Sequence, residues 1–92
     1  MSQNPFRLDG QVAIITGASK GIGESIAQTF AQNGAKVVVS SRKQEAVDEV
    51  AASIVAAGGE AIGVAAHVGD SHALQNLVNI TLEKYGRIDI IV

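Results

Sequence analysis

The sequence predicts an α/β fold in which helices cover both faces of a parallel sheet. Four apolar runs recur at even spacing, and segments with helical periodicity separate them. The runs are Val12–Thr16, Lys36–Ser41, Ala61–Ala66 and Ile88–Val92. They consist mainly of Val, Ile and Ala without regular polar alternation, which is typical of strands buried on both faces. Right-handed crossovers then predict the strand order 3-2-1-4, the N-terminal half of a Rossmann-type doubly wound sheet.

Three amphipathic helices are expected between the strands, at about Ile22–Asn33, Arg42–Ala57 and Ser71–Tyr85. Each carries apolar residues at helical spacing, which predicts one buried stripe per helix. The stripes are Ile22, Ile26 and Phe30; then Val47, Val50, Ala51, Ile54 and Val55; then Leu74, Leu77, Val78, Thr81 and Tyr85.

Residues with known capping preferences stand at the expected helix ends. Ser41 and Gln44 have the spacing of a capping box for the second helix, and Asp70 is a plausible N-cap for the third. Gly34, Gly58 and Gly86 follow the three helices, where glycine accepts the left-handed conformation.

Composition excludes several classes of function. The formal net charge of −2 argues against a nucleic-acid partner, and the absence of Cys excludes disulfides and thiolate metal sites. His67 and His72 lack a third ligand, so no metal site is predicted. No apolar run approaches the roughly 20 residues of a membrane span, and Met1–Pro5 lacks the apolar core of a secretory signal. We expect a soluble, cytoplasmic protein.

The segment Thr16–Gly23 lies between the first strand and the first helix and has the pattern T-G-x-x-x-G-x-G. Gly17 would allow a sharp turn, Gly21 would let a phosphate approach the backbone, and Gly23 would let the helix pack close to the sheet. The helix N-terminus beyond this turn favours a pyrophosphate. The alternative is a glycine-rich connection required by packing alone. A Walker-type phosphate loop is excluded because its Gly-Lys-Ser/Thr ending is missing.

With this spacing, the chain resembles the short-chain dehydrogenase/reductase family. Leu8–Gly17 looks like the typical opening of that family, and Tyr85–Val92 looks like its approach to the fourth strand. The resemblance implies a nicotinamide-dependent oxidoreductase that transfers hydride between the cofactor and a small carbonyl or alcohol substrate. The resemblance and our interpretation of the strand ends together imply the following cofactor-binding positions: Gly17, Ser19, Lys20, Gly21, Ile22, Gly23, Ser41, Arg42, His67 and Val68.

The end of the second strand predicts which cofactor is preferred. A carboxylate there would bind the ribose 2′-hydroxyl of NAD, but Ser40–Lys43 contains no acid. Arg42 and Lys20 could instead bind the 2′-phosphate of NADP, with a further bond from Ser41. Each charge-assisted bond contributes about 1.5–3 kcal/mol, so we expect NADP(H) to be preferred over NAD(H). The alternative is that Arg42 and Lys43 are solvated residues in the first turn of a helix.

Two other positions depart from the family pattern. Family members often carry Asp-Val after the third strand, where this chain has His67 and Val68. His67 could stack on or hydrogen-bond to the adenine, with a backbone contact from Val68, or it could be an ordinary loop histidine. Tyr85 is followed by Asp89 rather than Lys at the fourth position, so it is not the Tyr of the Tyr-x-x-x-Lys motif, and we expect it to pack at a helix end.

The catalytic Ser, Tyr and Lys of the family have no counterpart in these residues, so no catalytic residue is assigned. We therefore expect residues 1–92 to be the N-terminal part of a single NAD(P)-binding domain whose remainder is absent. The resemblance implies a homo-oligomer for the full-length enzyme. A non-catalytic nucleotide-binding or assembly fragment is the alternative.

Overall fold

The computed structural model describes residues 8–18, 21–67 and 69–92. The elements follow each other as a regular alternation of strand and helix. They are β1 (Val12–Thr16), α1 (Gly21–Gln32), β2 (Lys36–Ser41), α2 (Gln44–Ala56), β3 (Glu60–Ala65), α3 (Ser71–Tyr85) and β4 (Ile90–Ile91).

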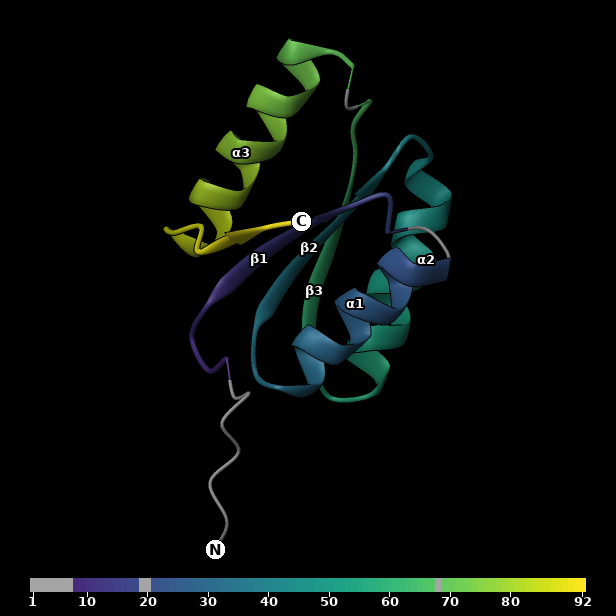
Figure 1. Ribbon diagram of the computed structural model, residues 1–92, viewed down its shortest axis with the longest axis vertical. Coiled ribbons are helices and arrows are strands. Elements are labelled where there is room, and N and C mark those ends of the chain that lie inside the picture. The colour runs from purple at the N-terminus through teal and green to yellow at the C-terminus, as the bar shows by residue number, and fades with distance from the viewer. Residues whose placement is uncertain (1–7, 19–20, 68) are drawn as a thin grey trace, which may run out of the picture.

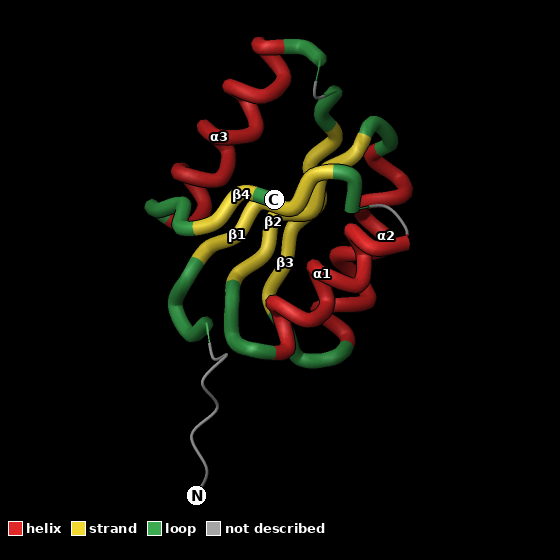
Figure 2. Tube along the Cα trace, in the orientation of Figure 1, coloured by secondary structure: helices red, strands yellow, loops and turns green. Residues whose placement is uncertain are grey.

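Within the described residues, the strands form one parallel sheet in the order β3-β2-β1-β4 (Figure 2). Val12 of β1 is in register with Lys36 of β2, and Lys36 is in register with Glu60 of β3. The predicted order is confirmed. The fourth strand lies where the sequence placed it, but its regular ladder covers Ile90–Ile91 only.

The helices lie on both faces of the sheet, with α1 and α2 on one face and α3 on the other (Figure 1). Alternate residues of each central strand contribute to two separate apolar clusters, because successive side chains point to opposite faces. In β2, for example, Val37 and Val39 join the cluster under α1 and α2, whereas Val38 joins the cluster that includes Leu77 of α3. This arrangement explains why the strand sequences are apolar throughout.

Two residues of the predicted helix stripes are exposed to solvent. Ile22, at the start of α1, is 80% exposed, and Val55 of α2 is 54% exposed. Val47 and Ile54 are seven residues apart, and both are buried. Val55 follows Ile54 and is rotated by about 100° around the helix axis, which turns it away from the sheet.

The helix ends agree with the sequence except at the start of α2. Asp70 caps α3 by accepting hydrogen bonds from the backbone N–H groups of His72 (2.9 Å) and Ala73 (3.3 Å). Gly86 ends α3 in the left-handed conformation, with φ of 79°. The predicted capping box of Ser41 and Gln44 is wrong, because α2 begins only at Gln44 and no side chain caps it.

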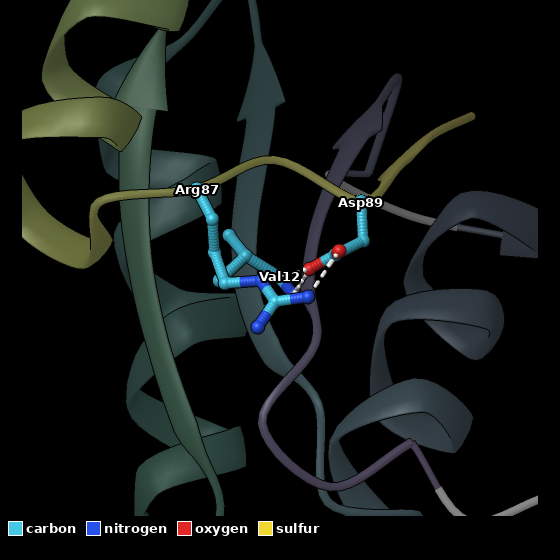
Figure 3. Close-up of polar contacts among 3 residues, drawn as sticks. All are labelled: Val12, Arg87 and Asp89. Atoms are coloured by element: carbon cyan, nitrogen blue, oxygen red, sulfur yellow. Dashed lines mark hydrogen bonds and ion pairs between the residues drawn. The ribbon is translucent and has the colours of Figure 1, made fainter.

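A side-chain network attaches the segment before β4 to the start of β1 (Figure 3). One carboxylate oxygen of Asp89 accepts hydrogen bonds from the backbone N–H of Val12 and from Nε of Arg87, each at 2.8 Å. The other oxygen accepts from Nη2 of Arg87 at 2.7 Å. The hydrogen bond from Arg87, followed by that from Val12, holds the pKa of Asp89 below its usual value. This network aligns β4 beside β1.

Tyr85 packs at the C-terminal end of α3, as predicted, against the cluster that contains Leu77. The ammonium of Lys36 lies 5.6 Å from the centre of its ring. Burial of the phenol, followed by the negative charge of Glu60, raises the pKa of Tyr85. Lys36 and Glu60 begin their strands, so Tyr85 lies at the amino end of the sheet.

Candidate nucleotide-binding site

The connection from β1 to α1 turns sharply on two glycines. Gly17 and Gly21 have φ of 64° and 67°, a region that favours glycine because other residues meet a steric penalty there. The expected turn at Gly17 is therefore confirmed. Apart from its chain neighbours, no atom of the described residues lies within 4 Å of the position that a Cβ on Gly21 would occupy, so among these residues its backbone faces open space. Ser19 and Lys20 lie outside the described residues.

Gly23 allows close packing at the start of α1. A Cβ at this position would lie 2.3 Å from the carbonyl oxygen of Gly17 and 3.0 Å from Cα of Ala18. The missing side chain thus lets the first turn of α1 close onto the backbone that directly follows β1. This contact joins the two ends of the loop.

The amino end of α1 follows directly on this loop. The first backbone N–H groups of a helix have no partner within the helix, and they carry about half a positive charge. Ile22 belongs to this turn, and its exposed side chain leaves the site open to a large ligand. Glu24 is the acidic residue of the first turn, and it accepts a hydrogen bond from Gln28 at 3.4 Å.

A backbone hydrogen bond joins the glycine loop to the end of β2. The N–H of Ala18 donates to the carbonyl of Ser40 at 3.0 Å. One residue later, the carbonyl of Ser41 accepts from the N–H of Ala66 at 2.8 Å, which extends the pairing of β2 with β3. Arg42 is exposed and lies in the bend before α2, so it is not in the first turn of the helix.

Gln44 makes a contact that the sequence did not predict. Its side-chain oxygen accepts a hydrogen bond from the N–H of Ala65 at 2.9 Å, and its nitrogen donates to the carbonyl of Gly63 at 2.8 Å. The same nitrogen donates to Asp48 at 2.7 Å. The side chain therefore binds β3 instead of capping α2. No sequence pattern would have indicated this contact, because it depends on the tertiary distance between α2 and β3.

The loop after β3 is folded around His67. Its Nδ1 accepts a hydrogen bond from the N–H of Gly69 at 3.1 Å, and its carbonyl accepts from the N–H of Asp70 at 2.9 Å. Nδ1 is thus used inside the loop, which leaves Nε2 as the ring nitrogen able to contact a ligand. His67 is exposed, and Val68 lies outside the described residues.

The last strand is attached to the start of the glycine loop. Both the N–H and the hydroxyl of Thr16 donate to the carbonyl of Val92, at 3.1 and 2.7 Å. Because the strands are parallel, the carboxyl ends of all of them lie at this same edge of the sheet. The strand order reverses at β1, between β2 and β4, and ligands of open α/β sheets bind outside such a switch point. The glycines, Ser41, Arg42 and His67 follow strands that end at this edge.

The described residues contain no helix that is long and apolar enough to cross a membrane. They also contain no cluster of three His, Asp or Glu side chains that could hold a metal ion.

Comparison with known proteins identifies the family. The sequence profile of the short chain dehydrogenases matches residues 11–92. The chain belongs to the short-chain dehydrogenase/reductase family of oxidoreductases. Among its relatives, the short-chain dehydrogenase/reductase SDRA of Arabidopsis thaliana is 49% identical over 88 residues, which cover 96% of this chain and 35% of the relative.

Solved structures of the family share the fold. The hydroxysteroid dehydrogenase of Escherichia coli superimposes with a TM-score of 0.92 at 42% identity, over 94% of this chain and 37% of that structure. A metagenomic short-chain oxidoreductase, solved in complex with NADP, gives a TM-score of 0.86 at 43% identity, over 91% of this chain and 38% of that structure. The chain thus spans about a third of the length of these family members.

Proposed function

We propose that this chain is the cofactor-binding part of an NADP(H)-dependent short-chain dehydrogenase/reductase. The reaction is hydride transfer between nicotinamide and a small carbonyl or alcohol substrate. The proposal rests on two features that lie together at the carboxyl end of the sheet. A glycine loop opens a helix at the switch point, and the neighbouring strand ends in Ser41 and Arg42 without a carboxylate.

The glycine loop would hold the diphosphate of the cofactor. Open space over Gly21 allows close approach to the backbone, and the helix N-terminus adds N–H donors and positive potential. We assign Ser19, Ile22 and Gly23 to the same diphosphate-binding segment. The nicotinamide, once bound, supplies the centre that gives or accepts hydride. The chain's own part is to bind and orient the dinucleotide.

Arg42 would select NADP by binding the 2′-phosphate, together with Ser41 and Lys20. Arg42 is exposed at the end of β2, next to the carbonyl through which Ser41 pairs with β3, so its backbone is fixed while its side chain is accessible. A charge-assisted hydrogen bond to phosphate contributes about 1.5–3 kcal/mol, equivalent to roughly 10- to 150-fold in affinity. The relative solved with NADP is consistent with this choice. His67 and Val68 would lie beside the adenine.

The proposal includes a longer protein whose remainder supplies the catalytic Ser, Tyr and Lys of the family. Exposed apolar side chains beside β4, notably Ile91 and Val92, support a covering segment on that side of the sheet. We further propose a cytoplasmic homo-oligomer without a nucleic-acid partner. A non-catalytic assembly fragment is the second candidate, favoured by the same exposed side chains. Oxidation of NADPH with a test dicarbonyl by the full-length protein would distinguish the two.

Titration of the protein with NADPH and with NADH tests the cofactor assignment. Tighter binding of NADPH is expected, and Arg42→Ala should reduce that preference about 10-fold or more. Lys84→Ala removes an exposed positive charge from the last turn of α3, far along the chain from this site, and serves as the control. Equal affinities in the wild-type protein, or tighter NADH, would contradict the assignment.

A further inference from the structure

We propose that Gln44 is a positioning residue for the segment that distinguishes NADP from NAD. The inference rests on the function proposed above. Among the described residues, the side-chain hydrogen bonds of Gln44 go to Asp48, Gly63 and Ala65 and not to the proposed cofactor site; Gln44 acts by fixing the backbone that carries Ser41 and Arg42.

The carboxamide of Gln44 takes the place of a neighbouring strand at the free edge of β3. Among the strands of the described residues, β3 has β2 on one side only, so its other edge has backbone groups without a partner from these strands. In a parallel ladder, one residue donates its N–H to a carbonyl of the neighbouring strand, and its own carbonyl accepts from the N–H two residues further along that strand. Gln44 reproduces this pattern by donating to the carbonyl of Gly63 and accepting from the N–H of Ala65.

The close approach of α2 to β3 makes this contact possible. A Cβ on Gly63 would lie 2.9 Å from the carbonyl carbon and oxygen of Val47 and 3.1 Å from the backbone nitrogen of Asp48. Any larger residue at this position would push α2 away from the strand. Asp48 also fixes the orientation of the carboxamide, since its carboxylate accepts from the nitrogen of Gln44 and so directs the oxygen to Ala65.

The segment between β2 and α2 is consequently attached to β3 at both ends. Ser41 is bound through its carbonyl to the N–H of Ala66, and Gln44 is bound through its side chain to the two residues described above. Within the segment, the hydroxyl of Ser41 accepts from the N–H of Lys43 at 3.3 Å. Arg42 lies between these attachments. Loss of the second attachment would leave the start of α2 free to move, and Arg42 with it.

The test compares two variants of Gln44 with a matched control. Gln44→Ala removes the side chain, and Gln44→Met keeps its bulk but removes its hydrogen bonds. Gln75→Ala is the control, because Gln75 is another exposed helical glutamine that donates to a residue four positions on, Asn79, at 3.1 Å. Affinities for NADPH and NADH are measured for each protein, and the exchange rate of the Ala65 amide hydrogen is measured by NMR.

Both Gln44 variants should reduce the preference for NADPH over NADH about three- to tenfold, the amount associated with one hydrogen bond, and Ala65 should exchange faster. Gln75→Ala should change neither. A preference that is unchanged in both Gln44 variants would overturn the proposal, whatever their stability. A wild-type protein without any preference would instead contradict the NADP assignment, and Arg42→Ala would then also have no effect on the ratio.

Discussion

Replacement of Gly23 by Ala should damage both the stability of the fold and the binding of the cofactor. The added Cβ would lie 2.3 Å from the carbonyl oxygen of Gly17, whereas ordinary contacts of this kind begin near 3.4 Å. The neighbouring atoms belong to the backbone of the loop, so no side chain can turn away to make room. Either α1 or the peptide after Gly17 must move.

The expected loss of stability follows from two opposing effects. Overpacking of this kind costs about 1–3 kcal/mol, while replacing a helical Gly by Ala returns at most about 1 kcal/mol. A contact of 2.3 Å with a backbone atom lies at the severe end of that range, so the net loss should be about 2 kcal/mol, which for a domain of this size lowers Tm by roughly 8–16 °C. Because the displaced loop is the proposed diphosphate site, the affinity for NADPH should fall further than stability alone explains.

Thermal unfolding and NADPH titration of the same samples measure the two effects. Gly58→Ala is the control: Gly58 has φ of 94° with no atom near a Cβ, so Ala is strained there without a clash. It lies between α2 and β3, at the opposite end of the sheet. The control should lose about 1–2 kcal/mol and bind NADPH normally. A Gly23→Ala protein with wild-type Tm and affinity would show that the loop is not closed as the structure has it.

Three further substitutions test other parts of the structure. Asp70→Ala removes the cap of α3 and should cost about 1 kcal/mol, measured by urea unfolding. The pKa of Asp89 is lowered in the folded protein. Its contribution to the free energy of unfolding is therefore present above the pKa that Asp has in the unfolded chain, and it is lost as the pH falls through the lower folded pKa. Asp89→Asn should remove this part of the loss of stability at acid pH. The hydroxyl of Tyr85 is buried without a hydrogen-bond partner among the described residues, so Tyr85→Phe should leave the free energy of unfolding unchanged or raise it. The pKa of Tyr85 is raised in the folded protein, so folding favours the neutral phenol. This contribution to the free energy of unfolding is lost only at alkaline pH, as the pH rises through the folded pKa, and the Phe variant should not show this alkaline loss of stability.

The fold could be predicted from the sequence because its main signals are local or periodic. Continuous apolar strands, helical stripes and glycines at helix ends gave the strand order and most element boundaries. Periodicity does not show where along a helix the buried stripe begins or how wide it is. Ile22, at the start of α1, and Val55, rotated away from the sheet beside the buried Ile54, were therefore expected to be buried and are exposed.

The candidate site was predicted in outline but not in its internal contacts. The positions of Gly17, Gly21 and Arg42 followed from their places at strand ends. Gln44 was assigned the wrong contact, and the contact of Gly23 with Gly17 was not predicted, since each involves backbone atoms whose distance only the folded chain defines. Binding of a cofactor by any of these residues remains a prediction.

The hydrogen bonds that join the strand ends also restrict how the chain can vary in length. Thr16 is tied to Val92, Ala18 to Ser40 and Ser41 to Ala66, so one extra residue in these connections would separate several partners at once. The amino end of the sheet has cross-links of its own, since Leu8 is bound to Asn33, Lys36 to Gln11 and Asp89 to Val12. In the connection from α2 to β3, by contrast, the described bonds of Gly58 and Gly59 go back to Val55 and Ile54 at the end of α2. Insertions, affinity tags or fused domains should therefore be accepted near Gly58 and rejected beside the glycine loop.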